Sequence, residues 1–336
     1  MKKTEPPAGS LSGVSGFPKS KTPFAKNTFP GNPFITKKAV LRDLKLNYAV
    51  YLMVLPVVVY FFIFHYMPMG GVLMAFQDFS VRRGIFGSQW LGLEHFIRFF
   101  NSVYFWRLIR NTLLISFYGL LFSFPLPIVF ALCLNEIKDK HFKKLIQTIS
   151  YLPYFISVVV VVSILIDFTK SQGILTRLAA LFGDKGGALI SRPEWFRTLY
   201  IGSNMWQHLG YNSIIFIAAL SGIDQELYEA AKIDGAGRWK QTLYVTLPGI
   251  ASTIVILLIL RLGQIMSIGF EKTILMYSPA TYETADVISS YTYRVGVIDN
   301  NYSYSTAVNL FNSVINFLML IAANKFSRKF SETSLW

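Results

Sequence analysis

Six long apolar segments constrain the fold of this chain more than any other feature of the sequence. They lie at about 48–70, 111–134, 145–167, 199–221, 243–268 and 305–324. Each approaches the roughly 20 residues that a helix needs to cross the hydrocarbon layer of a membrane. Charged residues make up only 15% of the chain, whereas a soluble domain carries about a quarter. The sequence therefore predicts an all-α, polytopic membrane protein with six transmembrane helices.

The two ends of the chain differ from this apolar body. Residues 1–40 are rich in Pro, Gly, Ser, Thr and Lys and show no apolar periodicity, a composition that is typical of a disordered tail. We expect this basic tail to act as a spacer, or to be attracted weakly to anionic membrane lipid. The six-span domain is expected to occupy residues 41–330, followed by a short C-terminal tail, 331–336.

The distribution of positive charge predicts the orientation in the membrane. Nineteen of the 32 Lys and Arg residues lie in the two ends and in the loops on their side, and twelve lie in the opposite loops. Because short cytoplasmic loops carry the excess of Lys and Arg, both termini and the loop at 225–248 are expected in the cytoplasm. The membrane accounts for the net charge of +14, so no nucleic-acid partner is expected.

The sequence contains no motif for catalysis or for a bound cofactor. It lacks the GxxxxGK[ST] phosphate-binding loop and the GxSxG nucleophile motif. The single cysteine, Cys133, lies in an apolar run, and the four histidines lack the spacing of a metal site. The histidines are His65, His95, His141 and His208. We expect a non-catalytic chain that binds no metal and no cofactor.

The stretch 225–248 is a polar and basic interruption between two apolar segments. Residues 225–232 (QELYEAAK) are good helix formers with acidic residues early, which favours the start of a helix. Gly235 and Gly237 then break the helix, so two short helices with a sharp corner are expected. A helix of this kind can dock in a groove of a soluble partner. One face of it carries Leu227, Ala230, Ala231 and Asp234.

The same stretch resembles a known signature. Residues 228–248 read YEAAKIDGAGRWKQTLYVTLP, which resembles the EAA loop, the cytoplasmic signature of permease subunits in binding-protein-dependent ABC importers. Val245 departs from the pattern, since the family usually has Ile there. The IDGA sequence at 233–236 is similar to the carbohydrate-importer branch. The matching residues are Glu229, Ala230, Ala231, Gly235, Leu247 and Pro248.

A second region carries a similar resemblance. Residues 270–296 read FEKTILMYSPATYETADVISSYTYRVG, and residues 302–317 read YSYSTAVNLFNSVINF. Both look like the permeases of oligosaccharide and uronide importers, which include the alginate importer. Together with the EAA loop, the resemblance covers most of residues 40–330.

The resemblance implies a type I ABC importer permease fold in the bacterial cytoplasmic (inner) membrane. It implies a second related permease subunit, ATP-binding cassette subunits that carry the ATP and Mg, and an extracytoplasmic solute-binding protein. The transported substrate would be an oligosaccharide, with an acidic or uronide sugar as one option. From the residues alone, an ordinary loop with Gly235 as a helix C-cap stays open. The coupling residues implied by the resemblance are Glu229, Ala230, Ala231, Asp234, Gly235 and Pro248.

Polar residues inside the apolar segments are candidates for a substrate path, because they are costly when they face lipid. Arg261, near the middle of the fifth segment, could hydrogen-bond a hydroxyl-rich or acidic sugar. It could equally form a structural pair with Asp167, Glu271 or a group on a partner subunit. The full set of candidates is Asn204, Trp206, Tyr211, Arg261, Gln264, Asn312 and Asn316.

Two groups of these candidates have alternative roles. Trp206 and Tyr211 could provide an aromatic platform for the apolar face of a pyranose ring, or Trp206 could anchor the helix at the membrane interface. Asn312 and Asn316 belong to a stripe of Asn in the sixth segment. Their amides could bind sugar hydroxyls or join neighbouring helices.

Three other functions are weighed against an oligosaccharide importer. An ion-coupled secondary transporter or channel would need acidic groups inside the membrane, and Asp167, near the end of a segment, is the one candidate. A membrane enzyme would need a catalytic motif, which is absent. An ABC permease for a solute other than a sugar is disfavoured by the IDGA sequence and by the resemblance of residues 270–320.

Overall fold

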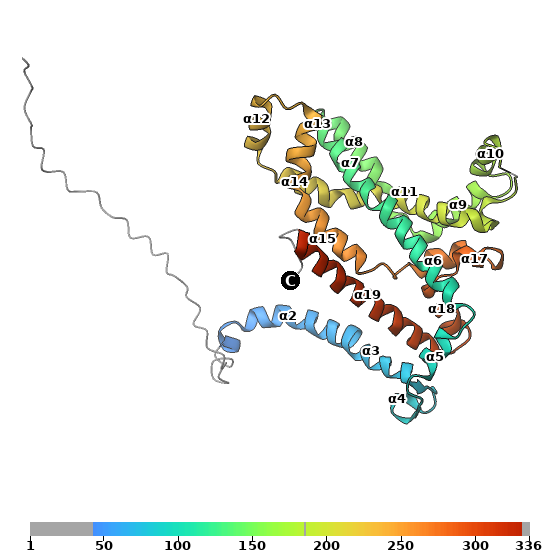
Figure 1. Ribbon diagram of the computed structural model, residues 1–336. Helices are drawn as coiled ribbons and strands as arrows, with labels where there is room; N and C mark the ends of the chain where they lie inside the picture. Colours follow the sequence, from blue (N-terminus) through green and yellow to red (C-terminus); the bar gives the residue numbers. More distant parts are fainter. Residues whose placement is uncertain (1–42, 185, 331–336) are drawn as a thin grey trace, which may run out of the picture. The chain divides into compact units, whose positions relative to one another are not determined.

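The computed structural model describes residues 43–184 and 186–330, and the expected tails at 1–40 and 331–336 lie outside the described residues (Figure 1). The chain divides into two units, residues 1–65 and 66–336.

The first unit contains the helix α2 (Tyr48–Phe61), which continues into the π-helical η1 (Phe62–Tyr66). All side chains of α2 are exposed within the described residues. The helix is apolar around its whole circumference, which is typical of a helix that is surrounded by lipid. The continuous helical stretch, Tyr48–Phe76, has 29 residues and is therefore longer than the predicted segment 48–70.

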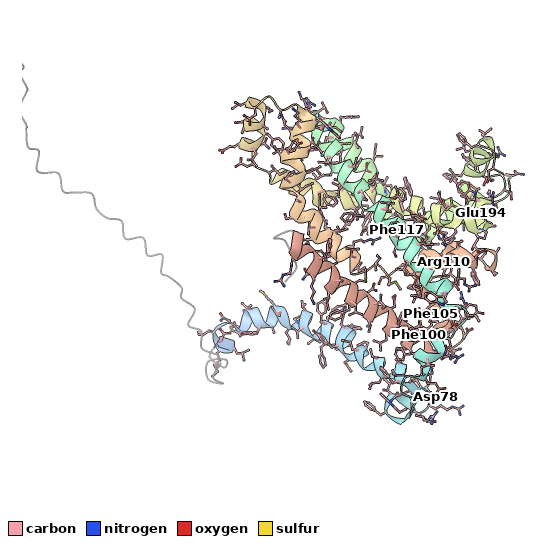
Figure 2. All side chains as sticks on the ribbon, in the orientation of Figure 1. Asp78, Phe100, Phe105, Arg110, Phe117 and Glu194 are labelled. Carbon is pink, nitrogen blue, oxygen red and sulfur yellow. The ribbon has the colours of Figure 1, made fainter. Side chains whose placement is uncertain are left out.

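The second unit begins with short elements that connect to the next long helix. After α3 and the 3-10 helix η2, a small antiparallel hairpin pairs Gln77 with Trp90 and Asp78 with Gln89. Phe100 in α5 and Phe105 at the start of the next helix lie close together, with 5.4 Å between ring centroids (Figure 2). The elements are α3 (Met67–Met69), η2 (Gly70–Phe76), β1 (Gln77–Asp78), α4 (Gly84–Gly87), β2 (Gln89–Trp90) and α5 (Glu94–Phe100).

The second apolar segment forms one helix, Phe105–Glu136, with an irregular turn in its middle. It consists of α6 (Phe105–Tyr118), the π-helical η3 (Gly119–Ser123) and α7 (Pro125–Glu136). The sequence predicts a kink at Pro125 and Pro127, because proline lacks an N–H and its ring clashes with the preceding turn. The wide π-helical turn directly precedes Pro125, where it accommodates the proline ring.

The third apolar segment is broken. It consists of α8 (Lys140–Tyr151), the 3-10 helix η4 (Leu152–Phe155) and α9 (Val158–Thr169), and the two halves are bent by 98°. A continuous segment over 145–167 is therefore not what the structure shows. The break has a local cause, since Pro153 lies in η4 and Ser157 caps the next helix by accepting a hydrogen bond from the Val160 N–H at 3.4 Å.

The fourth apolar segment lies within α11 (Pro193–Ser221), a helix of 29 residues. It follows the short elements α10 (Ile174–Leu181) and η5 (Leu189–Ser191). The helix α11 packs along α7 and α8. Where it meets α8, a Cβ on Gly210 would overlap the backbone carbonyl of Ser150, so a glycine is required for the two backbones to approach.

Replacing this glycine tests the close approach. Gly210→Ala is expected to destabilise the protein by about 1–3 kcal/mol, because backbone cannot move aside as a flexible side chain would. The matched control is Gly202→Ala on the same helix, where a Cβ meets nothing within 4 Å. That substitution should be neutral or stabilising, since alanine favours helix. Equal thermal unfolding of the two variants would contradict the packing described here.

The fifth apolar segment is also bent, by 59°. It consists of α13 (Arg238–Gln241), the π-helical η6 (Thr242–Thr246), α14 (Leu247–Gly249) and α15 (Ala251–Leu262), and α12 (Gln225–Ile233) precedes it. The bend follows Pro248, and the helix ends at Leu262 rather than at 268. The earlier end places Arg261 in the last turn of α15, which corrects the expected mid-span position.

The last part of the chain contains several short helices and one long one. The long helix covers the predicted sixth segment, 305–324, and extends beyond it at both ends. The elements are α16 (Phe270–Met276), η7 (Pro279–Thr281), α17 (Tyr282–Ala285), α18 (Ile288–Tyr293), the π-helical η8 (Arg294–Ile298) and α19 (Tyr302–Phe330).

Among the described residues, three helices are long and apolar enough to cross a membrane, or up to five if each bent pair counts as one span. The helix α11 is the sixth candidate expected from the sequence, and it is not one of these five. It carries polar residues such as Asn204, Gln207 and Asn212, and these lower its hydropathy.

Buried side chains of the second unit gather in three apolar clusters. One lies between α9 and α11, one between α5, α6, α18 and α19, and one between α7, the end of α11 and the start of α15. The largest completely buried side chains in the first two are Phe196 and Phe99. The third consists of Ile128, Ala131, Phe216, Leu220, Ile223 and Ile250, and it supports the polar stretch 225–248.

Candidate functional site

The polar stretch forms the two short helices that the sequence predicts, α12 and α13. The side chain of Asp224 caps α12 by accepting a hydrogen bond from the Glu226 N–H at 3.0 Å. Gly235 has a φ of +75°, a conformation that favours glycine, and it turns the chain after the helix. Gly237 then precedes the first residue of α13. We call residues 224–241 the elbow.

Three contacts hold the elbow against the rest of the second unit. The hydroxyl groups of Tyr228 and Thr246 lie 3.0 Å apart, which joins α12 to η6. The side chain of Arg238 forms an ion pair of 3.3 Å with Glu136 at the end of α7. The partly buried ring of Tyr228 packs against the third apolar cluster. The elbow is therefore attached to the end of α7 and to η6, which precedes α15.

The outer side of the elbow is exposed. Glu229, Ala230, Asp234 and Gly235 are all exposed, whereas Ala231 is half-buried. Two large apolar side chains extend beside them: Ile233 is 87% exposed and Trp239 is 75% exposed. Exposed apolar groups with acidic neighbours are typical of a surface that contacts another protein. Pro248, the last residue of the signature, is exposed at the bend that leads to α15.

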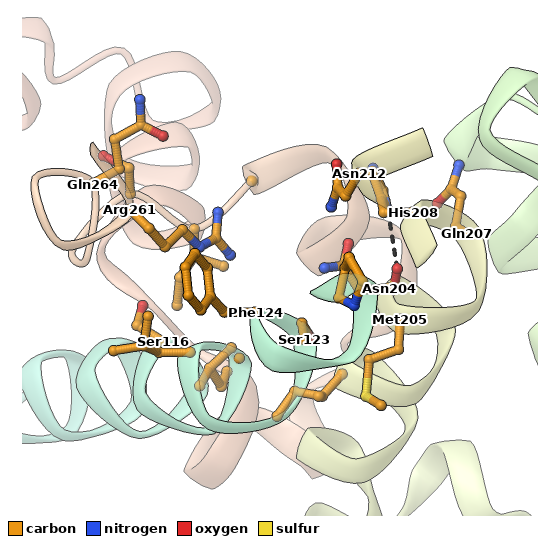
Figure 3. A pocket seen from close by; sticks show the side chains of 18 of the residues that line it. Ser116, Ser123, Phe124, Asn204, Met205, Gln207, His208, Asn212, Arg261 and Gln264 are labelled. Carbon is orange, nitrogen blue, oxygen red and sulfur yellow. Dashed lines mark hydrogen bonds between the residues drawn. The ribbon is translucent and has the colours of Figure 1, made fainter. Parts of the chain in front are cut away.

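A cavity of about 700 Å³ lies in the second unit (Figure 3). Its walls come from the kinked helix α6–η3–α7, from α11, from the end of α15 and the residues that follow, and from α16. The π-helical turn is part of the wall, which agrees with a role for the proline kink in shaping a cavity. The polar and charged lining residues are Ser116, Ser123, Asn204, Gln207, His208, Asn212, Arg261, Gln264, Ser267, Glu271 and Lys272.

The structure brings three of the seven substrate-path candidates together at this cavity: Asn204, Arg261 and Gln264. Asn204 extends from α11, while Arg261 and Gln264 extend from the opposite wall (Figure 3). Asn204, Gln207 and Asn212 of α11 thus line a cavity, and polar side chains within a membrane protein are tolerated where they face such a cavity instead of lipid.

The other four candidates do not line the cavity. Tyr211 stacks on Tyr154 at 3.6 Å between ring centroids, and Trp206 is half-exposed. Asn316 accepts a hydrogen bond from the Met266 N–H and donates one to the Ser267 hydroxyl, both at 2.9 Å. Asn316 therefore joins α19 to the residues after α15, as in the helix-joining alternative. Asn312 lies one turn earlier on α19.

Within the described part of the chain, Arg261 forms neither of the two ion pairs that the sequence suggests for it. Among the described residues, Asp167 pairs with Lys170 at 2.9 Å, and no ion pair joins Arg261 to Asp167 or Glu271. The guanidinium Nη2 approaches Gly119 of η3, where it is 4.0 Å from the position that a Cβ would take. The C-terminal end of α15 suits a cation, because the last carbonyl groups of a helix carry partial negative charge. An ion pair between Arg261 and a group on a partner subunit stays open as an alternative.

Comparison with known proteins assigns the chain to a family. Residues 123–332 match the family described as "Binding-protein-dependent transport system inner membrane component". The chain belongs to this family. The match includes the elbow and every polar residue of the cavity wall except Ser116. Membership disfavours the alternatives of an ion-coupled transporter and a membrane enzyme, and it places the permease in the inner membrane as a multi-pass protein.

Individual relatives and solved structures agree with this family. The permease is 40% identical over 301 residues to the polygalacturonan/rhamnogalacturonan transport system permease protein YteP of Bacillus subtilis, which covers 89% of this chain and 94% of YteP. A crystal structure of a bacterial alginate ABC transporter in complex with alginate pentasaccharide-bound periplasmic protein contains a chain with a TM-score of 0.80 and 42% identity. The match covers 88% of this permease and 99% of that chain.

A second crystal structure, of a bacterial ABC transporter involved in the import of the acidic polysaccharide alginate, gives a TM-score of 0.79 at 43% identity. It covers 86% of this permease and 98% of that chain. The all-α, type I importer fold expected from the resemblance is confirmed by these matches.

Sequence reasoning missed one charged residue of the cavity, Lys272. Its position after the fifth apolar segment predicts an exposed loop residue, yet Lys272 is only 6% exposed. Its Nζ makes no hydrogen bond within the described part of the chain and lies 5.2 Å from the ring centre of Tyr200. Burial lowers the pKa of Lys272 to about 8. The one available signal was the apolar context of the sequence FEKTILM.

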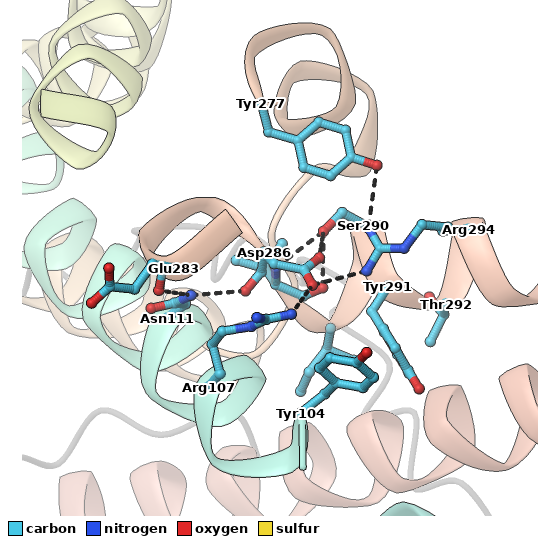
Figure 4. Close-up of polar contacts among 12 residues, drawn as sticks. Tyr104, Arg107, Asn111, Tyr277, Glu283, Asp286, Ser290, Tyr291, Thr292 and Arg294 are labelled. Atoms are coloured by element: carbon cyan, nitrogen blue, oxygen red, sulfur yellow. Dashed lines mark hydrogen bonds and ion pairs between the residues drawn. The ribbon is translucent and has the colours of Figure 1, made fainter. Parts of the chain in front are cut away.

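A buried carboxylate outside the cavity was also missed. Asp286 is completely buried, and its Oδ2 accepts hydrogen bonds from Arg107 at 3.1 Å and Arg294 at 2.9 Å (Figure 4). The Ser290 hydroxyl donates to Oδ1 at 3.0 Å, and Asn111 donates to the Asp286 carbonyl at 3.0 Å. This cluster joins α6 to α18 and η8.

The described residues contain no group of three or more His, Cys, Asp and Glu side chains that could hold a metal ion. The candidate site is therefore the cavity together with the elbow, and its chemistry is hydrogen bonding and charge.

Proposed function

We propose that this permease is one of two related membrane subunits of an ATP-driven importer for an acidic oligosaccharide. A solute-binding protein delivers the oligosaccharide outside, the cavity binds it during passage, and ATP-binding cassette subunits drive the cycle from the cytoplasm. Both termini and the elbow lie in the cytoplasm. The observation that carries this proposal is a cavity with two cations, Arg261 and Lys272, whose charges are not paired with acidic residues among those described.

The relatives support an acidic oligosaccharide as the substrate. YteP is described as a permease for polygalacturonan and rhamnogalacturonan, and the solved structures concern alginate, an acidic polysaccharide. All three substrates are polymers that carry carboxylate groups. A guanidinium binds a carboxylate through two parallel hydrogen bonds.

The neutral part of the cavity wall suits a sugar as well. Amide side chains such as Asn204 and Gln264 both donate and accept hydrogen bonds, as sugar hydroxyls do. The ring of Phe124 and the side chains of Ile115 and Leu257 offer apolar surface for the faces of pyranose rings. The other half of the path is expected from the second permease subunit.

The elbow supports coupling to a separate ATPase. Its exposed acidic and apolar side chains fit a groove in a soluble subunit, and the contacts of Tyr228 and Arg238 pass a displacement on to η6 and α7. Closure of the ATPase pair would thus displace η6 and the end of α7, and the helices that follow or precede them reach the cavity wall at Leu257 and Pro127. Alternating access follows if the outward and inward arrangements differ in their affinity for the substrate.

Arg261→Met tests the role of the cavity. With the assembled importer in liposomes, ATP inside and the binding protein outside, uptake of tetragalacturonate is expected to fall about 10- to 100-fold. The loss corresponds to charge-assisted hydrogen bonds worth roughly 1.5–3 kcal/mol.

The matched control is Arg177→Met on the exposed helix α10, which removes the same charge outside the cavity and should leave uptake within about twofold. Normal uptake by the Arg261 variant would remove Arg261 from the path. Absence of uptake by the unmodified importer, with several acidic oligosaccharides, would refute the proposed substrate class.

A further inference from the structure

Lys272 combines burial, positive charge and a position in the cavity wall. It is 6% exposed, and its Nζ has no hydrogen-bond partner among the described residues. A buried ammonium without such a partner destabilises the folded protein. The cation–π contact with the ring of Tyr200, 5.2 Å away, replaces only part of the hydration that the ammonium loses on burial. The residue nevertheless lines the cavity wall.

Among the described residues, no acidic side chain forms an ion pair with Lys272. The one carboxylate among the described lining residues is Glu271, which is exposed and forms no ion pair with Lys272 within the described residues. Arg261 lies in the same cavity and adds a second positive charge. Two cations that line the same cavity attract an anion into it.

The lysine side chain can reach a ligand in the cavity. Lys272 lines the cavity wall, and its ammonium is carried on a flexible four-carbon stem that can change rotamer when a ligand binds. A carboxylate would replace a weak cation–π contact with a charge-assisted hydrogen bond, which is the stronger interaction.

We propose that Lys272 is the specificity-determining residue of the cavity: its ammonium pairs with a carboxylate of the passing oligosaccharide and selects acidic over neutral sugars. The inference rests on the proposed function and identifies Lys272 as the group that recognises the charge of the substrate.

The pH dependence of binding follows from the position of Lys272. Burial lowers its pKa to about 8 in the empty cavity, so the ammonium is charged below that pH and loses its proton above it. Binding of a carboxylate needs the charged form. Affinity should therefore be constant from about pH 6.5 to 7.5 and fall about tenfold by pH 9.

Other titratable and charged groups lie on the elements around Lys272. They are Tyr200 and His208 of α11, Arg261 of α15, Glu271 of the same helix, Asp167 of α9 and Lys170 directly after it, and Tyr291 and Tyr293 of α18. The variant Lys272→Arg separates their effects from that of the lysine, because a guanidinium stays charged over this range.

The experiment measures binding to the solubilised complex of permease and ATPase subunits without the binding protein, so that discrimination belongs to the membrane subunits. The probes are tetragalacturonate and its fully methyl-esterified, uncharged counterpart, titrated calorimetrically. Lys272→Met should weaken binding of the charged probe at least about tenfold and leave the ester within about twofold. Lys272→Arg should retain binding of the charged probe and show a flat profile up to pH 9.

Each outcome bears on the inference. Equal losses for both probes, or a less stable complex in Lys272→Met, would show a structural role and overturn it. Unchanged binding of the charged probe by Lys272→Met would overturn the inference and leave the proposed function intact. Failure of the unmodified complex to bind or import any acidic oligosaccharide would refute the proposed function, and the inference with it.

Discussion

Glu229→Lys is expected to abolish ATP-driven uptake while the importer still assembles in the membrane. Glu229 is exposed on α12, so the substitution disturbs no buried contact and should not unfold the chain. Its effect arises at the proposed contact with the ATPase. Reversal of a charge in an interface costs several kcal/mol, which corresponds to a loss of transport of roughly a hundredfold or more.

The measurement compares substrate-stimulated ATP hydrolysis and uptake in liposomes with the amount of assembled complex. The control is Glu94→Lys, which makes the same charge reversal on the exposed surface of α5, away from the elbow, and should transport normally. Stimulated hydrolysis at the normal rate in the Glu229 variant would mean that the elbow does not receive the motion of the ATPase.

Asp286→Asn is expected to cause the largest loss of stability. The carboxylate is completely buried between two guanidinium groups, and the amide would leave both of them without an anion. Removing one partner of a buried ion pair costs about 3–5 kcal/mol. The lower end applies here, because the Arg107 and Arg294 side chains are 29% and 22% exposed and can regain some hydration.

A loss of about 3 kcal/mol should lower the apparent melting temperature by roughly 6–12 °C. Asp167→Asn is the matched control: it makes the same substitution in the exposed ion pair with Lys170, and surface pairs contribute about 1 kcal/mol or less. If both variants melted alike, the Asp286 cluster would not be the junction between α6 and the α18–η8 region that its contacts indicate.

The elbow is a part of the fold whose local structure follows from the residues nearby in the sequence. Good helix formers followed by Gly235 predict a short helix that turns at a fixed position, and α12 ends as expected. The helix and its turn both depend on residues within a few positions of each other. The causes are helix propensity, the cap at Asp224 and the positive φ at the turn. The predicted coupling role of Glu229 adds a partner chain, so it stays a proposal.

The bent helices show where local reasoning fails. Apolar length predicts a span over 145–167, but apolar length does not distinguish a straight helix from two halves bent by 98°. Pro153 and Ser157 were available as local signals. Likewise, Arg261 was placed in the middle of its segment by counting, and the helix ends one residue after it.

The sequence by itself determined that this protein is a membrane-embedded helical chain with a polar elbow, because segment length, hydropathy and glycine position act over short stretches of chain. The assignment as a permease came from the resemblance of residues 228–248 to the EAA loop and from the family match. Only the tertiary structure decided which polar residues share a cavity. It selected Asn204, Arg261 and Gln264, left Trp206 and Tyr211 outside, and added Lys272. The physical reason is that the face a side chain presents depends on which distant helices pack around it, and no short stretch contains that information.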